Sequence, residues 1–397
     1  MKNWKSYKVK DICDINQTTF SKKDNWEYVN YLDTGNITEN VIDSIQYIDL
    51  KEQKLPSRAK RKVKFNSIIY STVRPNQKHF GIIKKKPENF LVSTGFAVID
   101  PHQNIDADFL YYRLCQPDIT MHLQAIAEQS VSAYPSIKPT DIGELEICLP
   151  EYEEQKRISS FFLAIDQKIA INRAINKNLE EQANTIFISW FKNFEPFNGL
   201  MPNDWCYGTI QDLSTEIICG KTPSTKKKEY YGDAIPFITI PDMHNCVYAL
   251  ETEKKLSTLG ADSQKNKTLP YNSINISCIG TAGLVTLVPY PSQTNQQINS
   301  IIPRKGYSPY FIYLMMKSKS KEIHRLGQGG STIVNLNKAQ FGKITTIIPS
   351  PDIMMKFDGI VGPIFKLILS NQEMNIRLSR LKNNLLAILL NKEVKNN

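Results

Sequence analysis

The sequence predicts a mixed α/β (α+β) protein with a pseudo-twofold internal repeat, in which two similar globular domains are separated by two long helices that form an antiparallel coiled coil. Three observations support this class. Similar stretches recur about 200 residues apart in the same order. Each copy ends in a long segment with apolar residues at heptad spacing. Before these segments, short β-branched and aromatic runs such as "SIIYSTV" and "FAVID" alternate with amphipathic pieces such as "ADFLYYRLCQ".

Four matched stretches carry the repeat. Trp4 and Trp205 each open a copy, and the other matches pair "FNSIIYSTV" with "YNSINISCI", "DFLYYRL" with "PYFIYLM", and "SIKPTDIGELEICLP" with "NLNKAQFGKITTIIP". Because four matches in one register seldom arise by chance, we interpret the chain as a duplication. The predicted order is a first domain at 1–150, a helical spacer at 151–197, a second domain at 198–349 and a distal helix at 350–397.

The spacer has the pattern of one uninterrupted helix. Two rows of residues recur at every seventh position: Ile158, Ile165, Asn172, Leu179 and Ile186 in one row, and Phe162, Ile169, Asn176, Ala183 and Trp190 in the other. Such a seam is typical of a coiled coil. A helix from 153 to 191 would be roughly 55–60 Å long, which suits a rigid spacer.

The distal segment repeats this pattern. One predicted row is Ile360, Leu367, Met374, Leu381 and Ile388, and the other is Ile364, Asn371, Leu378 and Leu385. Asn371 is the repeat equivalent of Asn172, and a polar seam residue typically fixes the register and orientation of the partner helix. Because a globular domain separates the two helices in the chain, they can pair antiparallel. The alternative is that each helix packs only on its own domain.

A net charge of +10 suggests a polyanionic partner, and two clusters concentrate the positive charge. "KLPSRAKRKVK" at 54–64 contains no acid, and "GKTPSTKKKEYYG" at 220–232 sets lysines among hydroxyls and turn formers. Such cations neutralise phosphates and give DNA affinity that does not depend on sequence. For any single cation, a solvated surface position is the alternative. The candidates are Arg58, Lys60, Arg61, Lys62, Lys221, Thr222, Ser224, Lys226 and Lys227.

Reading of base edges requires side chains that make forked or paired hydrogen bonds. Arg74 and Lys78 in "STVRPNQKHFG", and Gln293 and Asn295 in "SQTNQQINS", are the candidates for this role. Two polar loops rich in small residues, at 127–136 and 326–335, could enter a groove of DNA. Their candidate residues are Gln129, Ser132, Tyr134, Gln328 and Ser331.

Other classes of protein are poorly supported. No run approaches the ~18 apolar residues of a transmembrane helix, and the first residues have no apolar signal core. Seven scattered cysteines without a CxxC motif favour reduced thiols in the cytoplasm and argue against zinc. Asp242 with Glu253 and Lys255 fits the loose pattern of a metal-dependent nuclease, which stays as an alternative function.

The segment "LPEYEEQKRISSFFLAIDQKIAINRAINKNLEEQANTIFISWF" at 149–191 resembles the central conserved region of type I restriction–modification specificity subunits. "GKTPSTKKKEYYGDAIPFITIPDM" at 220–243 is similar to the opening of their target recognition domains. "STVRPNQKHFG" and "LVSTGFAVI" resemble the equivalent parts of the first domain. The resemblance extends over essentially the whole chain.

This resemblance implies a non-catalytic subunit that binds double-stranded DNA, with no membrane partner. Each target recognition domain would read one half of a bipartite, asymmetric site, and the paired helices would set the length of the spacer between the halves. The helices would also dock two DNA methylation subunits, and restriction subunits would join through that core. S-adenosylmethionine, ATP and Mg²⁺ would belong to those partners, so this chain is expected to bind no cofactor or metal. A coiled-coil scaffold without sequence recognition is the remaining alternative.

Overall fold

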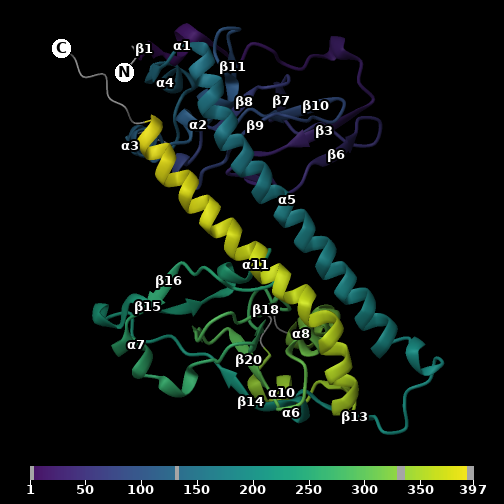
Figure 1. Ribbon diagram of the computed structural model, residues 1–397. Coiled ribbons are helices and arrows are strands. Elements are labelled where there is room, and N and C mark those ends of the chain that lie inside the picture. Colours follow the sequence, from purple (N-terminus) through teal and green to yellow (C-terminus); the bar gives the residue numbers. More distant parts are fainter. Residues whose placement is uncertain (1–3, 130–133, 329–335, 391–397) are drawn as a thin grey trace. The chain divides into compact units, whose positions relative to one another are not determined.

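The computed structural model describes residues 4–129, 134–328 and 336–390 of the chain (Figure 1). The chain forms two compact units. Unit 1 comprises Met1–Gln167 and Leu378–Asn397, and unit 2 comprises Lys168–Arg377. Both divisions fall inside the long helices, so each unit contains a part of both helices. The predicted domain limits at 1–150, 151–197, 198–349 and 350–397 stay a prediction.

Unit 1 is built from small sheets. One four-stranded sheet has the order β2 (Cys13–Ile15), β11 (Phe96–Pro101), β8 (Ile68–Ser71) and β9 (Phe80–Ile82). A second has the order β6 (Gln46–Asp49), β3 (Tyr28–Leu32), β10 (Phe90–Ser93) and β7 (Ala59–Lys62), with β3 and β10 parallel. Two smaller pairs join β1 (Lys5–Lys8) with β12 (Glu146–Leu149), and β4 (Ile37–Thr38) with β5 (Val41–Ile42).

The short helices of unit 1 begin where their sequences supply caps. Asp106 accepts a 2.8 Å hydrogen bond from the amide of Phe109 and so caps α2 (Ala107–Leu114). Proline opens both α3 (Pro117–Glu128) and α4 (Pro139–Gly143), where its missing N–H has no cost. The remaining short elements are α1 (Val9–Ile12) and the 3-10 turns η1 (Lys22–Asp24), η2 (Thr34–Asn36) and η3 (Pro75–Gln77).

Unit 2 repeats the fold of unit 1. Its four-stranded sheet, with the order β14 (Ser214–Cys219), β20 (Ile298–Pro303), β17 (Ile274–Ser277) and β18 (Val285–Leu287), matches the order β2-β11-β8-β9. Its second sheet, β16 (Lys254–Leu256), β15 (Tyr231–Ile238) and β19 (Gln293–Thr294), again contains one parallel pair. β13 (Cys206–Thr209) pairs with β21 (Thr345–Ile348) as β1 pairs with β12. The structure therefore confirms the duplication.

Four short helices of unit 2 follow in the same order as those of unit 1, and α7 (Thr258–Asp262) is an addition without a counterpart among the described residues there. The helices of unit 2 are α6 (Ile210–Leu213), α7, α8 (Pro309–Ser318), α9 (Ser320–Gln328) and α10 (Lys338–Gly342), with 3-10 turns η4 (Glu195–Phe197), η5 (Lys228–Tyr230), η6 (Ile240–Met243) and η7 (Lys265–Lys267). Among the described residues, no helix combines the length and the apolar character needed to cross a membrane.

The two long helices are α5 (Tyr152–Phe191) and α11 (Pro351–Leu390), each of 40 residues and so about 60 Å long. The predicted helix at 153–191 is confirmed. Pro363 lies inside α11, where it removes one hydrogen bond of the helix backbone.

The residues of the seam predicted along the first helix are buried or half-buried. Ile158, Phe162, Ile165, Ile169 and Asn172 are buried, and Leu179 and Ile186 are half-buried. On α11 the four predicted residues of one row, Ile364, Asn371, Leu378 and Leu385, are half-buried.

The companion row predicted for α11 is wrong. Ile360, Leu367, Met374, Leu381 and Ile388 are all exposed, by 43 to 66%. Two buried residues, Val361 and Ile368, each lie one position after a residue of the predicted row. Both rows are apolar, so periodicity alone could not tell which one faces the protein.

The C-terminal end of α5 belongs to the hydrophobic core of unit 2. The ring of Phe191 lies 4.7 Å from that of Phe311 and 4.9 Å from that of Phe357, measured between centroids, and it stacks on Trp205 at 5.5 Å. Edge-to-face aromatic pairs of this kind add about 0.5–1.5 kcal/mol each to the burial of their surface. α5 is thus anchored in unit 2 by a cluster of aromatic rings.

Candidate nucleic-acid interface

The first basic cluster lies on and beside β7, the last strand of its sheet. Arg58 and Lys60 are exposed, whereas Arg61 and Lys62 are half-buried. Lys62 forms an ion pair with Asp24. Arg58 and Lys60 are therefore accessible to a phosphate, while the charge of Lys62 is already compensated inside unit 1.

Two predicted base-reading cations flank η3. Arg74 precedes this turn and Lys78 follows it; both are exposed, and both have positive φ angles, 46° and 57°. Lys78 forms an ion pair of 2.7 Å with Glu39. The guanidinium of Arg74 instead lies 5.0 Å from the centroid of the Tyr134 ring, which is itself exposed. The two cations thus have different surroundings.

The second basic cluster forms the loop between β14 and η5. Lys221, Ser224 and Lys226 are exposed along this loop. Lys227 is also exposed, but its ammonium donates a 3.1 Å hydrogen bond to the hydroxyl of Tyr230 and lies 4.9 Å from the centroid of that ring. The loop therefore presents several lysines together with a hydroxyl group, which is a composition suited to phosphate contacts.

A close backbone approach fixes the start of this loop. A Cβ added at Gly220 would lie 2.2 Å from the carbonyl oxygen of Asn295 and 2.4 Å from that of Thr294, so no side chain fits there. The hydroxyl of Thr222 donates a 2.7 Å hydrogen bond to the side chain of Gln296. These contacts join the basic loop to the turn that follows β19.

A hollow of about 380 Å³ lies next to this loop. Asn295 is one of its lining residues and is 9% exposed, and it exchanges two hydrogen bonds of 3.0 Å with Gln297. The side chain thus holds the turn and faces a recess. The lining residues are Thr222, Thr225, Tyr231, Phe237, Thr239, Lys254 and Asn295.

Gln293 requires a correction. It was predicted to read a base, but its side chain is fully buried. Its amide nitrogen donates to the carbonyl of Ala261 at 3.0 Å and to the hydroxyl of Thr268 at 2.9 Å, and its amide oxygen accepts a 2.8 Å hydrogen bond from Gln264. Because these groups are satisfied inside unit 2, Gln293 stabilises the fold and is not available to DNA.

The two polar loops are only partly covered by the structure. Gln129 is exposed directly after α3, and Tyr134 is exposed beyond the gap. Ser132 and Ser331 lie outside the described residues, and so does the side chain of Gln328 at the end of α9.

Two asparagine pairs join the long helices within unit 2. The side-chain amide of Asn172 donates a 2.8 Å hydrogen bond to Asn375, and the amide of Asn371 donates a 2.8 Å hydrogen bond to Asn176. Asn176 also donates to the carbonyl of Ile368 at 3.1 Å. The predicted polar seam residues are thus in contact, although Asn172 pairs with Asn375 and not with its own repeat equivalent.

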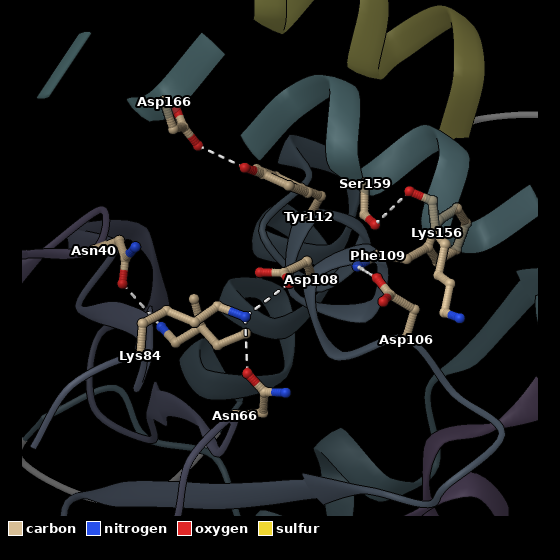
Figure 2. Close-up of polar contacts among 11 residues, drawn as sticks. Asn40, Asn66, Lys84, Asp106, Asp108, Phe109, Tyr112, Lys156, Ser159 and Asp166 are labelled. Carbon is tan, nitrogen blue, oxygen red and sulfur yellow. Dashed lines mark hydrogen bonds and ion pairs between the residues drawn. The ribbon is translucent and has the colours of Figure 1, made fainter. Parts of the chain in front are cut away.

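Within unit 1, α2, α5 and α11 meet at the carboxylate of Asp166, whose contact with Tyr112 is drawn in Figure 2. The hydroxyl of Tyr112 donates a 2.7 Å hydrogen bond to Asp166, and the ammonium of Lys382 lies 2.6 Å from the other oxygen of Asp166. Burial and the charge of Asp166 raise the pKa of Tyr112, so its phenol stays protonated and keeps donating.

Unit 2 has a corresponding contact. The hydroxyl of Tyr313 and the ammonium of Lys317 each lie 2.6 Å from one oxygen of Glu180 in α5. Burial raises the pKa of Tyr313, with a further contribution from the charge of Glu180.

These tyrosine–carboxylate contacts were missing from the predicted set. A signal for them existed, because Tyr112 and Tyr313 occupy the same place in the matched stretches "DFLYYRL" and "PYFIYLM".

The nuclease pattern has a structural explanation. The carboxylate of Asp242 accepts hydrogen bonds from the amide and hydroxyl of Thr239, at 2.8 and 2.7 Å, and from the amide of Glu253 at 2.9 Å. Asp242 therefore caps η6 and holds the following segment. Throughout the described parts of the chain, no group of three or more His, Cys, Asp or Glu side chains is placed to hold a metal ion.

The chain is a duplicated α/β protein with two long helices and with exposed cations in both halves. This architecture suits a DNA-binding protein with two recognition modules. Comparison with known families agrees. Residues 1–181 and 202–395 match the family described as "Type I restriction modification DNA specificity domain". The chain belongs to this family.

Two relatives and one solved structure place the chain further. It is 33% identical to the type I restriction enzyme HindI specificity subunit of Haemophilus influenzae, over 99% of this chain and 100% of the relative. It is 24% identical to the MjaIX specificity subunit of Methanocaldococcus jannaschii, over 98% and 93%. A crystal structure of a type I restriction–modification system S subunit from M. genitalium shares the fold, with a TM-score of 0.58, 15% identity, and coverage of 99% of this chain and 97% of that one.

Proposed function

We propose that this chain is the sequence-specific DNA-binding subunit of a type I restriction–modification complex, and that each globular half reads one half of a bipartite, asymmetric site. The observation that carries this proposal is the repeated sheet order in a chain that belongs to the DNA specificity family. The copies differ in their exposed loops, as expected if they read different half-sites. The target recognition domains would span 1–150 and 198–349.

We further propose that α5 and α11 form an antiparallel coiled coil that sets the spacer between the half-sites. In support of this, contacts move forward along α5 as they move backward along α11: Asp166 with Lys382, then Asn172 with Asn375, then Asn176 with Asn371. Antiparallel helices make contacts in this order. Two half-sites read from one face of DNA and separated by one helical turn are about 34 Å apart. A helix of about 60 Å can span that distance with its ends anchored in the two domains.

The proposed partners are double-stranded DNA, two DNA methylation subunits and, through them, restriction subunits. The exposed apolar row of α11, from Ile360 to Ile388, is a surface that such a subunit would cover, because a row of this length is costly to leave in water. In this proposal the chain is non-catalytic and works in the cytoplasm. S-adenosylmethionine, ATP and Mg²⁺ would be bound by the partners.

Methylation mapping tests the proposal. The chain is expressed in a host with its cognate methylation subunit, and the host DNA is sequenced for methylated adenines. The expected result is a bipartite motif with a fixed gap that is lost when this chain is deleted. A continuous motif, or methylation that persists without this chain, would favour the alternative of a scaffold without sequence recognition.

A further inference from the structure

Arg74 has a backbone conformation that is unusual for its residue type. Its φ and ψ angles, 46° and 68°, lie in the left-handed region, which is unfavourable for an L residue other than glycine. Eight of the twelve non-glycine residues with positive φ in the described structure are asparagines, which tolerate this region. Arginine has no such tolerance, so its presence at this position requires another explanation.

The repeat supplies a direct comparison. Arg74 is the third residue after β8, and Gly280 is the third residue after the equivalent strand, β17. Gly280 has a φ angle of 73°. Both copies therefore use a left-handed residue at the same place, and unit 2 has the residue that adopts it without strain. Unit 1 keeps the left-handed conformation at this position with a long, charged side chain.

The turn that carries Arg74 is held from both sides. The amide of Arg74 donates a 2.9 Å hydrogen bond to the carbonyl of Pro135, and its carbonyl accepts one of 2.9 Å from the amide of Gln77. The amide of Asn76 donates to the side chain of Gln124 on α3 at 3.2 Å. These contacts fix the direction in which the Arg74 side chain leaves the backbone.

The guanidinium is oriented but keeps its hydrogen-bond donors accessible. It lies over the ring of Tyr134, with 5.0 Å between its central carbon and the ring centroid, and Arg74 is exposed. Within residues 4–129, 134–328 and 336–390, no carboxylate forms an ion pair with it, whereas Lys78 at the other end of η3 is paired with Glu39. A guanidinium on an aromatic ring presents its planar fork of N–H groups at one edge.

We propose that Arg74 is a specificity-determining residue that reads a guanine in the major groove of the half-site bound by unit 1. This inference rests on the proposed function of the chain. The fork of an arginine matches the O6 and N7 acceptors of guanine, and it is the commonest specific contact to that base. Gly280 cannot make this contact, so the corresponding turn of unit 2 recognises its half-site by other residues.

A phosphate contact is the competing role for an exposed arginine. It would use the charge of Arg74 and not the geometry of the fork, so lysine would replace it well. The two roles therefore predict different behaviour of a charge-preserving variant.

The experiment uses the full chain in complex with its methylation subunit. Methylated motifs are mapped for the wild type, for Arg74→Gly and for Arg74→Lys, and binding is measured against duplexes in which each base pair of the motif is exchanged. Arg74→Gly introduces the residue type of Gly280, its equivalent in unit 2, and relieves the backbone strain. The thermal midpoint of this variant should therefore equal or exceed that of the wild type. Lys60→Ala is the matched control, because it removes an exposed cation of the same unit.

The expected result is that both Arg74 variants lose discrimination at one guanine of one half-site by about tenfold or more, while the other half-site is read as before. Lys60→Ala should weaken binding to all duplexes alike. Retained discrimination in Arg74→Lys, uniform weakening in Arg74→Gly, or a motif without guanine in either half would overturn the inference and leave the proposed function standing. A wild-type complex without sequence preference would overturn both.

Discussion

The side-chain amides of Asn172 and Asn375 meet across α5 and α11 with 2.8 Å between donor nitrogen and acceptor oxygen. Asn371 donates to Asn176 at the same distance, which is the equivalent contact under the internal repeat. Asn172 is 1% exposed, and the oxygen of its side-chain amide has no hydrogen-bond partner within the described protein. This polar layer is therefore sensitive to the loss of any one amide.

Replacing Asn375 by leucine should destabilise unit 2. The amide of Asn172 would remain buried without an acceptor, which costs about 1–3 kcal/mol. Urea denaturation monitored by tryptophan fluorescence should show a lower midpoint. Lys177→Leu, on an exposed position of α5, is the control and should leave the midpoint nearly unchanged. An equal effect of the two substitutions would show that the asparagine layer has no special role.

Lengthening both helices should lengthen the DNA spacer. Seven residues are inserted after Asn176 and seven before Asn371. The seam is preserved because one heptad makes two helical turns and returns to the same face of the helix. The added rise is about 10 Å, which corresponds to roughly three base pairs at 3.4 Å each. Methylation mapping should show both half-sites unchanged and the gap extended. An unchanged gap would refute the role of the helices as a spacer, and insertion into α5 alone should abolish methylation.

Tyr112→Phe should loosen the contact between α2 and α5. The substitution removes the donor to Asp166, and Lys382 remains as the partner of that carboxylate. We expect a loss of about 1 kcal/mol, since the carboxylate is partly accessible to water. A double-mutant cycle with Asp166→Asn should recover most of this as coupling energy. Tyr207→Phe, at a residue that is 76% exposed, is the matched control.

Gly220→Ala should impair recognition by unit 2 alone. Its Cβ would collide with main-chain oxygens of Asn295 and Thr294, so the basic loop must move. We expect methylation or binding to lose dependence on one half-site while the other is read normally. Gly35→Ala is the control, because an added Cβ meets nothing within 4 Å there. Equal behaviour of the two variants would show that the position of the loop is unimportant.

Lys60→Ala and Lys226→Ala should weaken DNA binding without changing the motif. Each removes one exposed cation suited to a phosphate contact. The slope of log affinity against log salt should fall by about one for each substitution. A change of preferred bases would instead show that the lysine reads sequence.

Much of the fold could be predicted because each copy of the repeat independently indicates the same elements. The matched stretches predicted the duplicated domains, and the heptads predicted α5 and α11 together with the asparagines at 172 and 371. The exposed row of α11 was misassigned because Ile360 and Val361 are both apolar, and only the neighbouring elements decide which of two adjacent rows is buried.

The candidate interface was less predictable for a related reason. The sequence does not show whether a cation has a carboxylate partner in the folded protein. Lys62 and Lys78 each form an ion pair, whereas the guanidinium of Arg74 lies over the ring of Tyr134. Gln293 looked available because it lies in a polar stretch, yet its partners come from segments about 30 residues earlier. Such contacts depend on tertiary structure and leave no local pattern.

The division of α5 and α11 between both units has a consequence for how the chain is made. Unit 1 includes the end of α11, so it stays incomplete until that helix has been synthesised. α5 precedes α11 by about 200 residues, which a ribosome needs roughly 10–40 s to add. During that time Asn172 and Asn176 of α5 lack the asparagines of α11 with which they pair. In a neighbouring nascent chain, the same two residues of α5 could provide complementary amides. Slow translation of the second half therefore favours pairing between chains, and rapid delivery of α11 favours pairing within one chain.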